Sequence, residues 1–132
     1  AEIAFSSEEN TKKLNRIMHP AVTESVKKII AEKTACRIPV LVDGAAIIEA
    51  GVNKITDMTV SVLAPENIRK KRISSRDGIS ESMINERFSV QLSDSDYIKN
   101  SDINIVNDGS HDIKELAETV KEYIKNRQEE SV

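Results

Sequence analysis

The stretch Met58–Lys71, with the sequence MTVSVLAPENIRKK, decides the fold class. Its first six residues, 58–63, are rich in β-branched side chains, which is typical of a strand. Pro65 and Glu66 follow directly, and a proline with an acid in the first turn is typical of a helix start. The sequence therefore predicts a strand that passes into a helix, as in the repeating unit of a parallel α/β sheet.

Two further strands are predicted outside this stretch, at residues 38–42 (IPVLV) and 103–106 (INIV). A short apolar helix or turn over 45–50 follows the first of them. After the second, Ser110 is expected to cap a last helix whose apolar residues recur at helical spacing. Strand and helix thus alternate three times, which predicts a parallel sheet with flanking helices. Ligands of such sheets bind at the carboxyl ends of the strands, here residues 43–44, 64–65 and 107–110.

The remaining segments are predicted to be helical. Residues 11–19 and 22–33 carry apolar side chains at helical spacing, and Pro20 is expected to interrupt or open a helix between them. Asp77-Gly78 is expected to end the helix that starts near Pro65. Ser80 is expected to cap the next helix, and a further break and cap is expected around Ser93.

The composition of the chain argues against some classes of function. The chain has 132 residues with a net charge of −3, and hydrophobic residues make up 39% of it. Neither nucleic-acid nor membrane binding is expected, since both usually require a basic patch, and no apolar run is long enough to span a bilayer. The single cysteine, Cys36, forms no internal disulfide, which agrees with a cytoplasmic location. A sheet this small also suggests a missing βαβ segment or self-association.

Arginines on one helix face form the first candidate site. Arg69, Arg72 and Arg76 are spaced three and four residues apart, so they lie along one face, where guanidinium groups can grip a polyphosphate. Asp77-Gly78 would let the next segment move as a lid. Arg87 and Gln91, four apart on the following helix, could face the same ligand. Ordinary solvated surface residues would give the same spacings.

Candidate polar residues also lie at the other loops. Asp43, at the end of a predicted strand, is placed to hold Mg²⁺ or to cap the next helix. Asn107 and Gly109 suit a nucleotide base or a plain strand-to-helix connection. His19 and Glu49 are candidates for substrate contact or for local capping. The sequence contains no GxxxxGK[ST] phosphate loop.

The order of these elements resembles that of dephospho-coenzyme A kinases. The resemblance runs from Leu14 to Ile124. It rests on the segment LNRIMHP at 14–20, the strand-Asp segment 38–49, the acid-led strand 57–63, the R-x-x-x-R-D-G element at 72–78, the R-x-x-x-Q element at 87–91, and the D-x-x-I-x-N-x-G end at 102–109.

The resemblance implies a P-loop kinase fold, N-terminally truncated, with a helical substrate part at about 11–36 and the lid with its following helices at about 76–100, all in a single domain. It implies transfer of the ATP γ-phosphoryl group to the ribose 3′-hydroxyl of dephospho-coenzyme A. The roles that follow are catalysis by Asp43 and Arg76, with Mg²⁺ at Asp43 through water; ATP binding by Arg72, Arg76, Asn107 and Gly109; and substrate binding by His19, Glu49, Arg87 and Gln91.

The chain departs from the family pattern in several places, among them Tyr97, where a basic residue is common, and Ser101, where Ala is usual. Ala45, Ala46 and Ile48 stand where the family has Pro, Leu and Phe, and the family's phosphate loop is absent from these 132 residues. The chain alone is therefore expected to be inactive. Two other interpretations stay open, which are a nucleoside monophosphate kinase and a non-catalytic nucleotide-binding or assembly domain.

Overall fold

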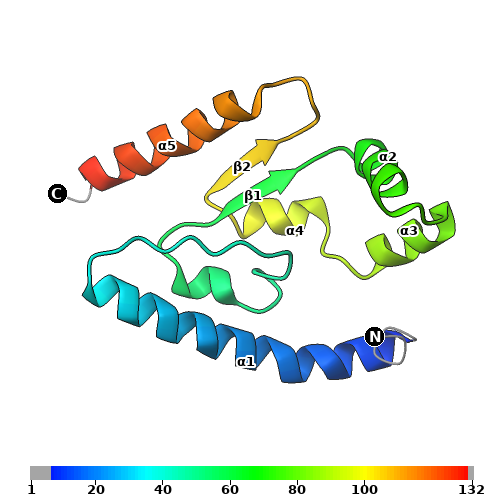
Figure 1. Ribbon diagram of the computed structural model, residues 1–132, viewed down its shortest axis with the longest axis horizontal. Helices are drawn as coiled ribbons and strands as arrows, with labels where there is room; N and C mark the ends of the chain where they lie inside the picture. Colours follow the sequence, from blue (N-terminus) through cyan, green and yellow to red (C-terminus); the bar gives the residue numbers. More distant parts are fainter. Residues whose placement is uncertain (1–6, 131–132) are drawn as a thin grey trace. The chain divides into compact units, whose positions relative to one another are not determined.

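The computed structural model describes residues 7–130, in which helices flank one small sheet (Figure 1). In chain order the elements are α1 (Glu8–Ala35), the 3₁₀ helix η1 (Val52–Ile55), β1 (Val60–Leu63), α2 (Glu66–Asp77), α3 (Glu81–Ser89), α4 (Asp94–Lys99), β2 (Ile103–Val106) and α5 (Ile113–Glu130).

The sheet consists of β1 and β2, which run parallel, side by side (Figure 1). In its register Val60 lies opposite Ile103 and Leu63 opposite Val106. The sequence prediction of a parallel α/β arrangement is therefore confirmed, with β1 two residues shorter at its start than expected. Parallel strands need a long crossover, and here α2, α3 and α4 supply it.

The predicted strand at 38–42 is wrong, because this segment has no regular secondary structure. Leu41 is 93% exposed and Ile38 is 50% exposed. A strand exists only where its backbone finds a ladder partner, and within residues 7–130 each of β1 and β2 pairs with the other alone. The following residues, 45–50, form turns, as one of the two sequence alternatives expected.

Pro20 does not interrupt α1, contrary to the sequence prediction. The helix continues through it from the Ser7 cap, whose side chain accepts the Asn10 N–H, to Ala35. A proline inside a helix removes one N–H donor and so leaves the carbonyl four residues earlier unbonded. That carbonyl belongs to Arg16, and because Arg16 and Pro20 are exposed, water can satisfy it.

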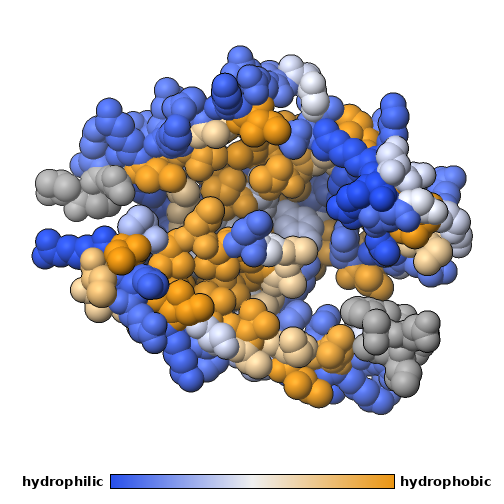
Figure 2. All heavy atoms as spheres, viewed as in Figure 1, coloured by the Kyte–Doolittle hydropathy of each residue, from blue (hydrophilic) through white to orange (hydrophobic). Residues whose placement is uncertain are grey.

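The chain divides into two units, the first ending at Met58 and the second beginning at Thr59. In the first unit, Thr23 of α1 donates its hydroxyl hydrogen bond to the Ala50 carbonyl at 2.8 Å. Exposed apolar side chains also occur along α1, where orange residues alternate with blue ones (Figure 2). In the second unit α2 packs on α3, and Ile84 and Ile103 are buried.

Most predicted helix boundaries of the second unit are confirmed. Gly78 ends α2 in the left-handed conformation, with φ of 64°. Ser80 accepts the Met83 N–H at the start of α3, and Ser93 forms a capping box with Asp96 at the start of α4. Serine and aspartate side chains that satisfy the first N–H groups of a helix explain these starts.

Ser110 does not cap α5, so that prediction is wrong. Its N–H and hydroxyl both bond the Asp108 carboxylate, at 2.8 and 2.6 Å, in a local turn. The cap is Asp112 instead, whose carboxylate accepts the Lys114 N–H at 3.2 Å. Among residues 7–130, no helix has the length and apolar character needed to cross a membrane.

Asp102 joins the starts of both strands. Its N–H donates to the Thr59 carbonyl at 2.9 Å, and its carboxylate accepts the Thr59 N–H at 2.8 Å. The other carboxylate oxygen accepts a bond from Arg127 of α5 at 3.0 Å. The Thr59 bond first, and Arg127 second, lower the pKa of the Asp102 carboxyl. Asp102 therefore fixes the register of the sheet and ties α5 to it.

We predict that Asp102→Asn lowers the free energy of unfolding by about 1–3 kcal/mol, the usual contribution of hydrogen bonds to a charged group. Urea unfolding measures this free energy. The control is Glu118→Gln on the exposed side of α5, which should change the free energy of unfolding by less than about 0.5 kcal/mol. Because the pKa of Asp102 is lowered in the folded state, its contribution is full at neutral pH and is lost at acid pH. The two proteins should therefore converge in stability as the pH falls.

Candidate functional site

The carboxyl ends of β1 and β2 are joined to α2 through Asn107. The Asn107 N–H donates to the carbonyl of Leu63, the last residue of β1, at 2.8 Å. Arg72 of α2 donates from Nη1 to the Asn107 carbonyl at 2.8 Å, and its Nη2 lies 3.5 Å from the Asn107 Oδ1. Ligands of parallel α/β sheets bind at this edge, so Arg72 lies where an anionic group would be held.

Gly109 lies beside the same arginine. Its φ is 93°, a region that L side chains rarely adopt, and a Cβ built on it would lie 3.9 Å from Arg72 Nη2. That distance is ordinary van der Waals contact, so the backbone conformation rather than the available space requires glycine here. Arg72, Asn107 and Gly109, all predicted to bind ATP, are therefore brought together.

A second cluster forms at the end of α2. Arg76 grips Asp77 with both Nε (2.6 Å) and Nη2 (3.2 Å), and Arg87 of α3 bonds the same carboxylate at 2.9 Å. The Asp77 side chain is 24% exposed, whereas those of Arg76 and Arg87 are 73% and 51% exposed. We name these three residues the Asp77 cluster.

The two arginines stabilise the ionised form of the Asp77 carboxyl group. The hydrogen bonds from Arg76 and then Arg87 lower the pKa of Asp77 to about 2. A carboxylate whose pKa is lowered in the folded state contributes its interactions above its ordinary pKa and loses them only as the pH falls to the lowered value. Asp77 is thus ionised throughout the physiological range.

Arg69, the third arginine of the predicted row, is engaged within the protein. Its Nη2 bonds Asp94 of α4 at 3.1 Å, and its guanidinium lies 5.0 Å from the centre of the Phe88 ring of α3. The side chain is only 28% exposed. Arg69 therefore links α2 to α3 and α4, while Arg72 and Arg76 keep polar partners near the surface.

The sequence predicted that Arg87 and Gln91 lie on the same helix, and this prediction is wrong. The helix α3 ends at Ser89, and the Gln91 N–H bonds the Phe88 carbonyl at 3.2 Å in the turn that follows. The four-residue spacing therefore does not place the two side chains on one helix face, because that rule applies only inside a helix.

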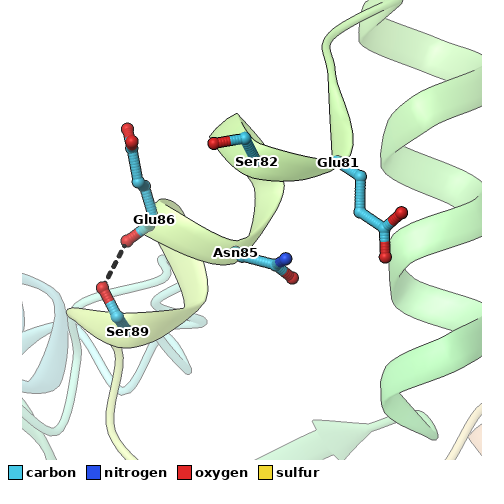
Figure 3. Close-up of a pocket in the computed structure, with 5 residues that line it drawn as sticks. All are labelled: Glu81, Ser82, Asn85, Glu86 and Ser89. Carbon is cyan, nitrogen blue, oxygen red and sulfur yellow. Dashed lines mark hydrogen bonds between the residues drawn. The ribbon is translucent and has the colours of Figure 1, made fainter.

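A shallow depression lined by polar residues lies along α3 (Figure 3). Glu81 and Asn85 extend to one side of the helix, and Ser82 and Glu86 point away from them. The Ser89 hydroxyl is bonded to the Glu86 carbonyl at 2.8 Å. All the lining residues belong to one helix and their side chains do not converge, so the depression is a solvated helix face.

His19 lies in a shallow groove on α1 in the first unit. The residues lining this groove recur at helical spacing along one face, and they are Lys12, Asn15, Arg16, His19 and Pro20. All five residues belong to one helix, as at the depression on α3, so the groove is likewise a solvated helix face, with Lys12 and Arg16 as its basic side chains.

Asp43 and Glu49 also belong to the first unit, and both residues are exposed. The Asp43 carboxylate makes no hydrogen bond or ion pair with the described part of the chain. Within residues 7–130, no three metal-binding side chains gather at one point. Magnesium in phosphoryl-transfer sites usually takes one or two carboxylates, with waters and substrate phosphates as the other ligands, so a single exposed aspartate fits that role.

Asp77 was not predicted as a site residue, because the sequence placed it at the helix break, in the lid hinge and in the R-x-x-x-R-D-G element without a ligand role. A signal was present, since an acid directly after Arg76 can fold back onto it. Its second partner, Arg87, lies ten positions further on, beyond the turn at Gly78, and only the folded structure reveals that contact.

Comparison with known proteins gives one consistent result. The family model described as Dephospho-CoA kinase matches residues 1–112. The Dephospho-CoA kinase of Corynebacterium diphtheriae is 35% identical over 113 residues, covering 85% of this chain and 56% of the relative. The enzymes of the same name from Fusobacterium nucleatum and Geobacillus kaustophilus are 31% and 32% identical, each covering 83% of this chain and 55% of the relative. The chain spans about half the length of the curated relatives it matches.

We predict that Gly109→Ala lowers the free energy of unfolding by about 1–2 kcal/mol, because alanine is strained at positive φ. Gly44→Ala is the matched control: Gly44 has no positive φ, and its added Cβ would lie 3.7 Å from Ile47 in ordinary contact. Chemical unfolding of both variants measures the difference. Equal effects at the two positions would contradict the conformational requirement at Gly109.

Proposed function

This chain belongs to the dephospho-CoA kinase family, and from that membership we propose that it serves the transfer of the ATP γ-phosphoryl group to the ribose 3′-hydroxyl of dephospho-CoA. This reaction is the last step of coenzyme A synthesis, and we place it in the cytoplasm. The observation that carries the proposal is the convergence of Arg72, Asn107 and Gly109 at the carboxyl ends of β1 and β2.

The nucleotide side of the proposed site lies in the second unit. Arg72 and Arg76 are one helical turn apart on α2, so both can face the phosphates of ATP. Asn107 offers amide groups to the adenine, and Gly109 leaves room for the close approach of a ligand to the backbone. In phosphoryl transfer, catalysis rests on position and on charge stabilisation, which guanidinium groups supply to the phosphate oxygens.

His19 and Glu49 of the first unit are proposed to contact dephospho-CoA, and the same role is proposed separately for Arg87 and Gln91 of the second unit. The groove on α1 supports His19, because Arg16 and Lys12 beside it add positive charge for an anionic substrate. The shared Asp77 carboxylate brings Arg87 next to Arg76, which supports a role for Arg87 near phosphate groups of either ligand.

Magnesium is proposed to accompany ATP, with Asp43 as a partner through water. When bound, the ion neutralises charge on the phosphates. Asp43 and Arg76 are the proposed catalytic residues. The segment around 76–100 is proposed to comprise the lid and its following helices, with Gly78 as the hinge, and the segment around 11–36 the substrate-binding part.

We predict that the 132-residue chain binds dephospho-CoA at least about tenfold more tightly than AMP or dCMP, but transfers no phosphate by itself. The sequence has no GxxxxGK[ST] loop to cradle the ATP phosphates. Titration calorimetry measures the affinities, and a phosphate-transfer assay with ATP and dephospho-CoA measures the activity. Equal affinities would favour a nucleoside monophosphate kinase, and turnover at an ordinary enzyme rate would contradict the expected inactivity.

We predict further that Arg72→Ala weakens ATP binding about tenfold, because a charge-assisted contact to phosphate is lost. Lys71→Ala is the matched control, since Lys71 is an exposed neighbour on the same helix. An unchanged ATP affinity in the Arg72 variant would remove Arg72 from the proposed site.

A further inference from the structure

We propose that Asp77 is a positioning residue that holds Arg76 and Arg87 together as one unit for binding a chain of phosphates. The proposal rests on the proposed function and deepens it. It assigns a role to a side chain that belongs to the R-x-x-x-R-D-G element but received no role of its own from the resemblance. The ligand class is an inorganic or nucleotide polyphosphate.

The geometry of the Asp77 cluster leaves both arginines able to bind a ligand. Arg76 uses one edge of its guanidinium, Nε and Nη2, to hold Asp77. A guanidinium carries five N–H donors, so the outer edge at Nη1 still presents donors. Arg87 uses Nη1 alone. Since the arginine side chains are 73% and 51% exposed, the remaining donors are accessible to a ligand from solvent.

The charge of the Asp77 cluster favours an anion. Two guanidinium groups and one carboxylate sum to a net charge of +1, and the negative member is the least exposed of the three at 24%. A phosphate that approaches from outside therefore meets the cations first. A carboxylate that fixes an arginine on one edge restricts its rotamers, so less conformational freedom is lost when a phosphate binds the other edge.

The location of the Asp77 cluster connects it to the nucleotide side of the proposed site. Arg76 lies one helical turn beyond Arg72, which is bonded to Asn107 at the carboxyl edge of the sheet. Arg87 lies on α3, beyond the Gly78 turn that ends α2. Asp77 therefore ties the last turn of α3 to the last turn of α2. One carboxylate sets the spacing of two phosphate-binding groups that come from different helices.

The test is Asp77→Asn, titrated with inorganic tripolyphosphate and with ATP by calorimetry. An asparagine of the same shape keeps one acceptor and loses the charge. We expect an approximately tenfold weaker affinity for tripolyphosphate, and a smaller loss for Asp77→Glu, which restores the charge. Asp94→Asn is the matched control, because Asp94 pairs with Arg69 rather than with the Asp77 cluster, and it should leave the affinity unchanged.

A positioning role is separated from a structural one by two further measurements. In an Arg76→Ala/Arg87→Ala background, Asp77→Asn should cause no further loss of tripolyphosphate affinity, since nothing remains to be positioned. The Nε–H resonance of Arg76, read by NMR without ligand, should be protected from solvent exchange in the wild type and lose that protection in Asp77→Asn. Neither readout depends on catalysis.

The outcomes separate the two proposals. A wild type that binds tripolyphosphate and ATP, with Asp77→Asn unchanged or tighter, overturns the role of Asp77 and leaves the proposed function standing. A wild type that binds neither ligand overturns both. A further loss of affinity in the double-arginine background would show that Asp77 acts through the fold, and this too overturns the proposal.

Discussion

The reciprocal contact between Thr59 and Asp102 is the constraint on which the second unit depends. The contact lies directly before the first residue of each strand and sets the register of the sheet. The Asp102 N–H bonds the Thr59 carbonyl, and the Thr59 N–H bonds the Asp102 carboxylate. Once Val60 is opposite Ile103, the parallel ladder places Leu63 and Asn107 together at the opposite end. A two-stranded sheet has few ladder bonds, so a side chain that fixes its pairing matters more than in a large sheet. The site thus depends on a contact at the other edge of the sheet.

Three arginines at nearly identical spacing on α2 have different surroundings. Arg69 faces α3 and α4 and is largely covered, Arg72 faces the turn after β2, and Arg76 lies at the helix end beside its own neighbour Asp77. Helical spacing determines which side chains share a face, but the partner of each is set by whichever element packs at that level of the helix. A row of like charges in a sequence can therefore divide into a structural part and a part available to ligands.

The sequence was informative where local chemistry decides the structure. The β-branched runs at β1 and β2, the Gly78 break and the serine caps of α3 and α4 follow from side chains acting within a few residues. Prediction from the sequence failed where the local structure depends on a partner that is distant in the sequence or missing. Residues 38–42 have strand composition but no ladder partner among the described residues, and Asp108 engages the serine expected to cap α5. Of the candidate site, Arg72, Asn107 and Gly109 were predicted to act together and do lie together, whereas the Arg87 contact with Asp77 needed the fold.

The unpaired segment 38–42 has a consequence for handling the chain in solution. Four of its five residues have β-branched or leucine side chains, its backbone pairs with no strand among the described residues, and Leu41 within it is 93% exposed. An exposed stretch of this kind can pair with a strand of another copy at high protein concentration, but Pro39, which has no N–H, removes one ladder bond and limits such pairing. The charged residues Arg37 and Asp43 flank it directly and act as gatekeepers, since stacking copies in register would bring like charges together. Aggregation of this chain should accordingly increase when salt screens those charges.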